Sequence, residues 1–184
     1  MIPYRKRLVL QRFIDVVSLK TTYRKQLDVK QRIKNAMVKK PIKKGIITSG
    51  YGDRINPFPP YATSFHGGID IAVKGNPDNV PVYCTHAGQV AYINHDISQG
   101  KNAGGGFGRV VYLKMPDGYY TIYAHLSLVS YDLKNGDDLK AGDFIGIMGS
   151  TGHSTGKHLH YQIRSTMGSG GESRCPQDVI DLYA

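Results

Sequence analysis

Seven short runs of apolar or alternating residues follow one another along the second part of the chain, and none exceeds eight residues. The runs are GIDIAV (68–73), VPVYC (80–84), GQVAYIN (88–94), GRVVYLKM (108–115), YYTIYAHL (119–126), FIGIMG (144–149) and HLHYQIR (158–164). Gly, Pro, Asn and Asp separate these runs, as is typical of an all-β domain. Before DVIDLY (178–183), no segment of this part invites a long helix. The pattern therefore predicts a mainly β fold.

Charge divides the chain into two parts. Residues 1–44 contain 14 of the 24 Lys and Arg residues and only two acidic residues, which gives this segment a charge of +12. Residues 45–184 carry 10 basic and 12 acidic residues, a charge of −2. We therefore predict a basic N-terminal arm over residues 1–44 and a nearly neutral domain over residues 45–184.

The arm is expected to contain some helix. Its first apolar residues fit one helical face, although VVSLKTTY (16–23) suits a strand equally well. Asp28–Lys40 is predicted to be a helix, with Asp28 as its N-cap and Pro41 beyond its end. The apolar stripe of this helix is too thin for an independent core, so the arm is expected to be disordered or bound to a partner.

Three kinds of partner fit the charge of the arm. The arm would attract the phosphates of nucleic acid strongly, but it holds only three aromatic residues and no recognisable binding motif. Anionic cell-wall polymers or a membrane surface are the second possibility. The third is docking onto protein partners in a larger assembly, which we expect in preference to nucleic-acid binding.

No apolar run in the sequence is long enough to cross a membrane. The chain opens with positive charge, but Gln11, Arg12 and Asp15 interrupt the apolar stretch that a secretion signal needs. If the protein works outside the cell that makes it, we expect another route to deliver it.

Two histidines lie two residues apart in HLHYQIR. In a strand, His158, His160 and Gln162 would share one face, and the apolar residues between them would share the other. Two imidazoles on one side of a strand suggest a metal site or proton transfer. The alternative is a pair of solvated histidines on an edge strand.

Three further residues carry groups that suit the same chemistry. His66 lies in HGGID with Asp70 four residues on, and His125 lies at the end of an alternating run. Asp70 lies between two isoleucines and projects from the face of its strand opposite to them. Its carboxylate therefore needs a partner, and a zinc ion would be a sufficient one. The remaining histidines lie in turn-rich contexts and are predicted to be ordinary surface or loop residues: His86, His95 and His153.

A catalytic zinc site needs more than ligands. It typically has three His or carboxylate ligands, one open position and a general base. Many zinc peptidases use glutamate as that base, but the only glutamate here is Glu172, in a Gly/Ser-rich loop, and the chain contains no H-E-x-x-H. A zinc hydrolase built from this chain must therefore use histidine as its base.

Several motifs of the chain together resemble the lysostaphin-type zinc endopeptidases of bacterial cell walls, a LytM-like family. The motifs are GYGDR (50–54), HGGID (66–70), YAHL (123–126), GDDLKAGDFIGIMG (136–149), GSTG (149–152) and STGKHLH (154–160). They occur in the order that the family shows and cover about residues 45 to 165. Each motif alone would be weak evidence, whereas the combination is specific.

The resemblance implies a role for each matching residue. His66, Asp70 and His160 look like the zinc ligands. His125 and His158 look like the pair that orients or deprotonates the attacking water and stabilises the tetrahedral intermediate. The implied fold is a small antiparallel β-sheet domain with a groove that is floored by the sheet and walled by loops.

The implied activity is zinc-dependent hydrolysis of peptide cross-links or stem peptides of bacterial peptidoglycan. The alternative is a non-catalytic subunit that binds peptidoglycan or has a structural role in a larger assembly. The intact set of five residues favours the enzyme, because binding alone needs no open zinc position with two spare imidazoles. Without a secretion signal and with a basic arm, such a hydrolase is expected in the tail of a bacteriophage virion, or otherwise outside the cell at the wall.

Three positions depart from the family pattern. Lys157 stands where the family commonly has Pro, Gln162 where it commonly has Glu, and Cys84 where it usually has a small residue such as Ala. None of these is one of the five site positions, so we expect an active enzyme of undetermined specificity. The sequence does not decide whether Cys84 and Cys175 form a disulfide.

Two loops are expected near the groove. GGGFG (104–108) lacks the spacing of a phosphate-binding loop and is predicted to be a flexible hairpin loop beside the cleft. NPFPPY (56–61) suits a substrate-contacting loop and an ordinary rigid turn equally well.

Overall fold

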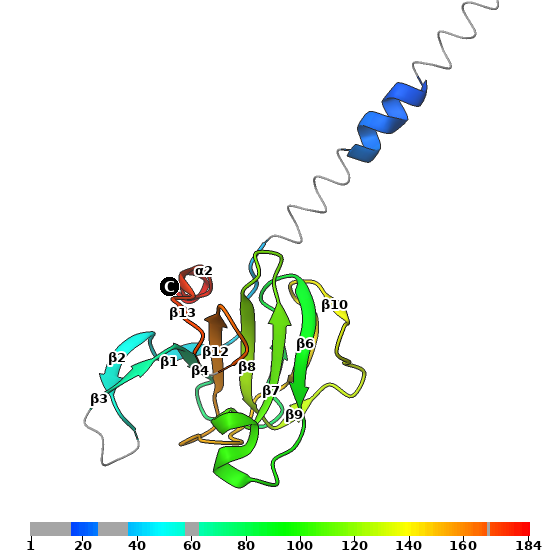
Figure 1. Cartoon of the computed structure of the whole chain (residues 1–184). Helices are drawn as coiled ribbons and strands as arrows, with labels where there is room; N and C mark the ends of the chain where they lie inside the picture. Colours follow the sequence, from blue (N-terminus) through cyan, green and yellow to red (C-terminus); the bar gives the residue numbers. More distant parts are fainter. Residues whose placement is uncertain (1–15, 26–36, 58–62, 169) are drawn as a thin grey trace, which may run out of the picture. The chain divides into compact units, whose positions relative to one another are not determined.

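The structure is a computed structural model that describes residues 16–25, 37–57, 63–168 and 170–184 (Figure 1). The chain divides into two compact units, Met1–Met37 and Val38–Ala184. Within the first unit, residues 16–25 are helical with exposed side chains, so the segment that suited helix and strand equally is a helix. The helix predicted over Asp28–Lys40 lies mostly outside the described residues, and its last four residues are not helical.

The second unit begins at Val38, before residue 45, where the charge pattern predicted that the domain begins. Lys39 donates its backbone N–H to the carbonyl of Thr85 at 3.0 Å. In a helix running through Lys39, this N–H would instead bond to a carbonyl of the preceding turn. Ile42 is 1% exposed and belongs to the core of the domain. Residues 38–44 therefore pack as part of the domain in spite of their positive charge.

The domain is built from short antiparallel strands. Its strands are β1 (Ile46–Ser49), β2 (Gly52–Ile55), β3 (Thr63–His66), β4 (Gly68–Ala72), β5 (Pro81–Tyr83), β6 (Gly88–Asn94), β7 (Arg109–Lys114), β8 (Tyr120–Leu126), β9 (Leu128–Val129), β10 (Asp138–Leu139), β11 (Phe144–Ile147), β12 (Leu159–Arg164) and β13 (Ser173–Arg174). A 3₁₀ helix, η1 (Gly100–Gly106), connects β6 to β7. The predicted mainly β, antiparallel fold is confirmed.

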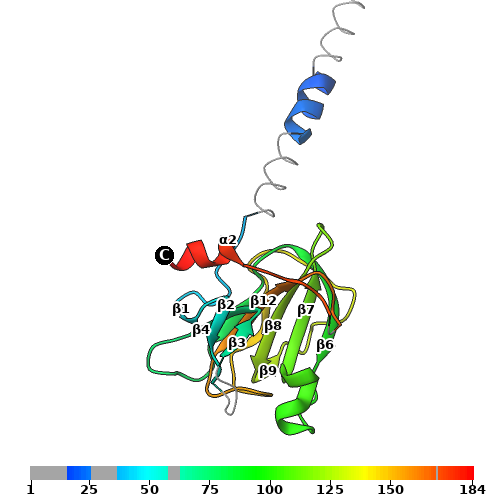
Figure 2. The ribbon, with the colours of Figure 1, turned by 60° about the vertical axis from the view of Figure 1, so that its left-hand side comes forward.

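Most of these strands belong to one large sheet. Its order is β1-β4-β12-β8-β7-β6-β10, and β13 pairs with β12. Strands β12, β8, β7 and β6 lie side by side at its centre (Figure 2). A second sheet has the order β5-β11-β9, and β2 and β3 form a separate two-stranded ribbon.

The two faces of β12 have different surroundings. Leu159, Tyr161 and Ile163 are at most 1% exposed and belong to the main hydrophobic core. Each fully buried side chain of this kind contributes about 1.5–3 kcal/mol to folding. The alternate residues of the strand project from the opposite face, which we call the site face. The predicted alternation thus places both histidines of HLHYQIR away from the main core.

The segment DVIDLY lies in two short helical segments at the end of the domain, α2 (Gln177–Ile180) and η2 (Asp181–Tyr183). The hydroxyl of Tyr183 donates to the carbonyl of Ile42 at 2.7 Å. His86 Nε2 lies 2.8 Å from the carboxylate of Asp178. His86, predicted to be an ordinary loop residue, therefore ties the C-terminal segment to the domain.

The two cysteines are not bonded to each other. Cys84 is buried, Cys175 is half-buried, and both thiols are free. Burial raises the pKa of the Cys84 thiol to about 12. Cys84 therefore packs as a small core residue in its neutral form.

Within the described part of the chain, no helix combines the length and the apolar character that crossing a membrane requires.

Candidate metal centre

Asp70 and His160 lie opposite each other on paired strands. The register of β4 and β12 places the Cα of His160 beside that of Asp70, and both side chains project from the site face. His66 ends β3, directly before the two glycines that lead into β4. All three residues are at most 8% exposed.

The two glycines of HGGID allow this close approach. A Cβ atom at Gly68 would lie 2.4 Å from the carbonyl oxygen of Tyr161, and one at Gly67 would lie 2.7 Å from the side-chain amide of Gln162. Any larger residue would push this segment away from β12. Glycine is therefore required here because it lets His66 reach the other two residues.

The three side chains converge on one point with one atom each. His160 Nδ1 lies 2.9 Å from Asp70 Oδ1, His66 Nε2 lies 3.2 Å from the same oxygen, and the two nitrogens are 3.1 Å apart. A tetrahedral zinc ion with bonds of about 2.0–2.1 Å holds its ligand atoms about 3.3 Å apart. The observed triangle therefore fits three of the four ligands of such an ion.

Hydrogen bonds on the far side of each ring fix which nitrogen carries the proton. His66 Nδ1 donates to the carbonyl of Gly50 at 2.7 Å, and His160 Nε2 donates to Gln162 Oε1 at 3.2 Å. In the neutral rings, His66 Nε2 and His160 Nδ1 then present lone pairs to the Asp70 carboxylate. Three acceptors at this separation repel one another unless a cation lies between them. The chemistry of the donor set therefore fits a zinc ion.

Gln162, at the position where the family commonly has Glu, contacts the His160 ring on the side that faces away from Asp70. Its Oε1 accepts the proton of His160 Nε2, and its Nε2 donates to Ser173 Oγ at 2.6 Å. The second bond fixes the amide so that its oxygen faces the imidazole. The departure from the family pattern thus preserves the ring orientation and removes one negative charge.

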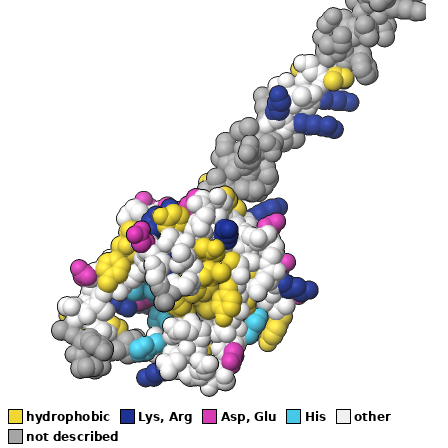
Figure 3. Space-filling model, viewed as in Figure 1, with side chains coloured by type: hydrophobic (Ala, Val, Ile, Leu, Met, Phe, Trp, Pro, Cys, Tyr) yellow, Lys and Arg dark blue, Asp and Glu magenta, His cyan; other side chains and the backbone are white. Residues whose placement is uncertain are grey.

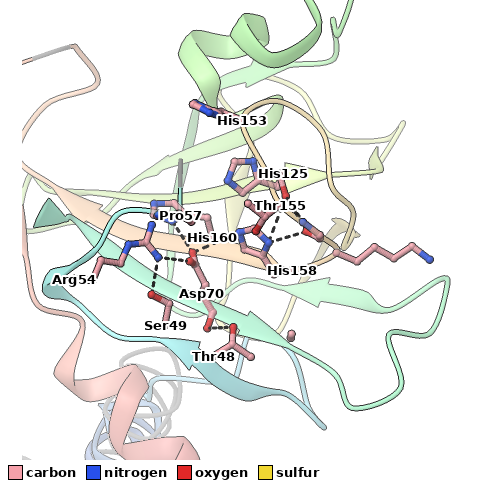
Figure 4. Close-up of a pocket in the computed structure, with 14 residues that line it drawn as sticks. Thr48, Ser49, Arg54, Pro57, Asp70, His125, His153, Thr155, His158 and His160 are labelled. Atoms are coloured by element: carbon pink, nitrogen blue, oxygen red, sulfur yellow. Dashed lines mark hydrogen bonds and ion pairs between the residues drawn. The ribbon is translucent and has the colours of Figure 1, made fainter. Parts of the chain in front are cut away.

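Arg54 holds the outer oxygen of Asp70, a contact that the sequence did not reveal. Its Nη1 lies 3.0 Å from Asp70 Oδ2 and also donates to Ser49 Oγ at 2.6 Å. Burial by itself would raise the pKa of Asp70, but hydrogen bonds from His160 and His66, donated when these rings carry a second proton in place of a metal, outweigh it and hold that pKa well below its usual range. The carboxylate is therefore ionised, with one oxygen at Arg54 and the other free to bind a metal (Figure 4).

Replacing Arg54 with Gln is expected to weaken zinc binding about 10- to 100-fold, because losing such an outer partner frees the ligand to rotate. Competition with a chromophoric chelator would measure the zinc affinity. Arg54→Lys keeps the charge near Asp70 and should retain part of the affinity. Wild-type affinity in Arg54→Gln would show that Arg54 does not position Asp70.

Two more histidines lie beside this centre. His158 directly precedes β12, and its Nε2 lies 3.5 Å from Asp70 Oδ1. His125 lies near the end of β8, and its ring centroid is 4.8 Å from that of His158. Figure 4 shows Asp70, His125, His158 and His160 pointing towards one another. The structure thus brings together all five residues for which the resemblance implied roles.

Backbone carbonyls fix the tautomers of this second pair as well. His125 Nδ1 donates to the carbonyl of Thr151 at 2.8 Å, and His158 Nδ1 donates to that of Gly156 at 2.8 Å. Burial lowers the pKa of both rings, to about 3 for His125. Both rings are therefore neutral near pH 7, and each offers the lone pair of Nε2 as a proton acceptor.

The backbone at His125 has a left-handed conformation. Its φ is +60°, which side chains other than glycine adopt rarely and at a cost. The N–H of His125 donates to the carbonyl of Phe107 at 2.8 Å, away from the regular ladder of the sheet. This local turn breaks the alternation of β8, so the ring of His125 reaches the site.

A cleft of about 340 Å³ lies over these side chains. His153, predicted to be an ordinary loop residue, lines this cleft, as do Pro57 and Lys157. His153 is an exposed loop residue, as predicted, and the sequence did not indicate that its loop borders the cleft, where its N–H donates to the carbonyl of Gly106 at 2.7 Å. Pro57 belongs to the loop predicted as a possible substrate contact, whose residues 58–62 lie outside the described part of the chain.

The Gly-rich segment lies beside the site but is not a simple hairpin loop. Its first glycines belong to η1, and the ring of Phe107 packs against that of His160 with a centroid separation of 5.6 Å. This contact joins segments that are far apart in the chain, so no local pattern of residues could indicate it.

Comparison with known proteins identifies a family that this chain resembles over most of the domain. Residues 64–173 match the model of peptidase family M23. The chain is 36% identical over 118 residues to the DD-carboxypeptidase/endopeptidase Mpg of Neisseria meningitidis, and the match covers 64% of this chain and 24% of that protein. The chain therefore spans about a quarter of the length of the curated relatives that it matches.

Two solved structures have similar folds. The catalytic domain of EnpA, a prophage-encoded M23 protein of Enterococcus faecalis solved as a point mutant, superimposes with a TM-score of 0.59 and 30% identity, over 78% of this chain and 95% of that one. Lysostaphin of Staphylococcus simulans superimposes with a TM-score of 0.62 and 25% identity, over 81% of this chain and 55% of that one.

Proposed function

Since the chain belongs to peptidase family M23, we propose that it is a zinc-dependent endopeptidase that cleaves stem or cross-link peptides of bacterial peptidoglycan. One observation carries the proposal beyond the family. Two neutral imidazoles, those of His125 and His158, present Nε2 beside a triangle of metal-ligand atoms that leaves room for one more ligand.

Zinc, when bound by His66, Asp70 and His160, would polarise the peptide carbonyl and activate water. The chain itself supplies the proton transfers. The lone pair of His158 Nε2, next to the metal ligands, accepts the proton of the attacking water, and the resulting imidazolium can donate it to the leaving amine. His125 Nε2, on a ring whose centroid is 4.8 Å from that of His158, is a second acceptor that orients the attacking water, and it can donate to the negatively charged carbonyl oxygen only once it has taken up a proton.

A non-catalytic peptidoglycan-binding role is the second candidate, because not every member of the family is an active enzyme. Such a binding role would require only the cleft and a metal ion that stabilises the fold. The tautomers of His125 and His158 oppose it, since a buried ring and a half-buried ring held with free acceptors are costly to maintain without a proton-transfer role.

Peptidoglycan lies outside the cytoplasmic membrane, so we also propose that the protein acts at the cell wall. More specifically, we propose delivery as part of a phage tail, with the part of the basic arm that precedes the domain, residues 1–37, as the docking segment. The similarity to a prophage-encoded protein supports it. Mass spectrometry of purified phage particles would test it, and absence of the chain from every particle preparation would oppose it.

The proposed activity predicts release of new amino termini from purified peptidoglycan. We expect a chelator to abolish the release and added zinc to restore it, because the three ligand side chains supply no nucleophile without metal. Mass spectrometry of the products would identify the bond. Full zinc occupancy without any release, on walls of several chemotypes, would favour the non-catalytic role.

A further inference from the structure

A second hollow of about 430 Å³ lies on the site face of the main sheet. It is lined largely by aromatic and apolar groups, with one charged side chain: Tyr92, Phe107, Tyr112, Arg164 and Met167. Figure 3 shows hydrophobic side chains gathered in the middle of this face of the domain, with histidine side chains beside them. The metal centre does not use any of these residues as a ligand.

The register of the sheet connects this hollow to the metal centre. Arg164 is four residues beyond His160 on β12 and projects from the same face, about 13 Å along the strand. The ring of Phe107 lies 5.6 Å from that of His160 and 6.3 Å from that of Tyr112. Tyr92 continues the series at 5.7 Å from Tyr112. One aromatic surface therefore runs from the metal ligands to the hollow.

Arg164 carries a charge that the described residues do not neutralise. Its Nη2 donates to the carbonyl of Gly168 at 2.6 Å, its buried Nε lacks a hydrogen-bond partner, and no carboxylate of the described chain pairs with it. Two of the other three arginines of the domain pair with a carboxylate, Arg54 with Asp70 and Arg174 with Asp117. Arg109 donates to the backbone carbonyls of His95 and Ser127, and it differs from Arg164 in that it does not line the hollow. A partly buried guanidinium without a carboxylate favours an anionic ligand.

We infer that this hollow is a specificity subsite in which Arg164 binds a carboxylate of the peptide substrate. The aromatic rings of Tyr92, Phe107 and Tyr112 would pack against the aliphatic part of the same residue. The distance of about 13 Å corresponds to roughly four extended residues, so the carboxylate belongs to a residue a few positions from the scissile bond. This inference rests on the proposed peptidase function and names a substrate feature that the function alone leaves open.

The test compares two synthetic cross-linked stem peptides that differ only in whether their side-chain carboxyl groups are free or amidated. We expect the wild-type enzyme to cleave the free form with a kcat/KM about tenfold higher, mostly through KM, because a charge-assisted contact is lost in the amide. Arg164→Gln should cleave both forms with similar kcat/KM values, close to that of wild type on the amide. A third peptide, amidated only at its C-terminal carboxyl, distinguishes a side-chain carboxylate from a chain terminus.

Arg174→Gln is the matched control, since Arg174 lies on the strand next to Arg164 and its guanidinium is already paired with Asp117. It should keep the wild-type preference. Equal loss of preference in both variants would indicate general electrostatic attraction and overturn the inference. A wild-type enzyme that cleaves both peptides equally would overturn it while leaving the proposed function intact, whereas cleavage of neither peptide, together with no release from peptidoglycan, would reject the function itself.

Discussion

His160→Ala is expected to lose zinc and activity together. His160 supplies one of the three converging atoms, and its ring also contacts Phe107. Since removing an outer partner of a ligand already costs about 10- to 100-fold in metal affinity, removing the ligand should cost about 100-fold or more. Zinc content after dialysis and the rate of amino-terminus release from peptidoglycan would both be measured.

His95→Ala provides the matched control for this substitution. His95 is an exposed histidine outside the site, so its loss should leave zinc content and rate unchanged. Circular dichroism would establish that His160→Ala remains folded, because the main core lies on the other face of β12. A folded His160→Ala protein with full zinc and full rate would remove His160 from the ligand set.

His125→Ala and His158→Ala are expected to keep zinc and lose turnover. Neither ring is one of the three converging groups, whereas both present acceptors towards the cleft. Loss of a positioned proton acceptor typically lowers kcat roughly 10²- to 10⁴-fold, and we expect that range for each variant. Single-turnover rates on a defined peptide, at full zinc occupancy, would separate this effect from metal loss.

His153→Ala is the appropriate comparison, since His153 lines the same cleft but has no assigned role in proton transfer. Its kcat should stay within a few-fold of wild type. If all three variants lose turnover equally, the effect belongs to the shape of the cleft. If His125→Ala and His158→Ala both turn over at the wild-type rate, proton transfer must use other groups.

The lowered pKa of His125 provides a second readout for the same variant. Burial, followed by the charges of His160 and His158, lowers this pKa from 6.5 to about 3. Between these pH values the unfolded chain binds more protons than the folded chain, so the free energy of unfolding decreases as the pH falls. In urea denaturation of the metal-free protein between about pH 7 and pH 4, His125→Ala should show a shallower decrease than wild type.

The sequence alone predicted the strands and the residues of the site. The period-two alternation of HLHYQIR is a local property, and it assigned Leu159 and Tyr161 to the core and His160 to the opposite face. The glycines of HGGID, by contrast, are required by the close approach of this segment to β12, a long-range contact that the sequence did not indicate. The roles of the histidines came from the resemblance of several motifs in the right order, and those roles stay predictions until the variants are measured.

The tertiary structure decided what depends on contacts between distant segments. Residues 38–44 belong to the domain because backbone pairing and burial of Ile42 outweigh their charge. The sheet order also brings distant segments into contact around the metal centre. Examples are the ion pair of Arg54 with Asp70, the hydrogen bond from His153 N–H to the carbonyl of Gly106, and the packing of Phe107 on His160. Periodicity in a sequence records which face of a strand is buried, but it does not record which strand lies beside it. Pairing between strands is set by the packing of the whole domain, so the metal centre, its supporting arginine and the neighbouring hollow exist only once the chain has folded.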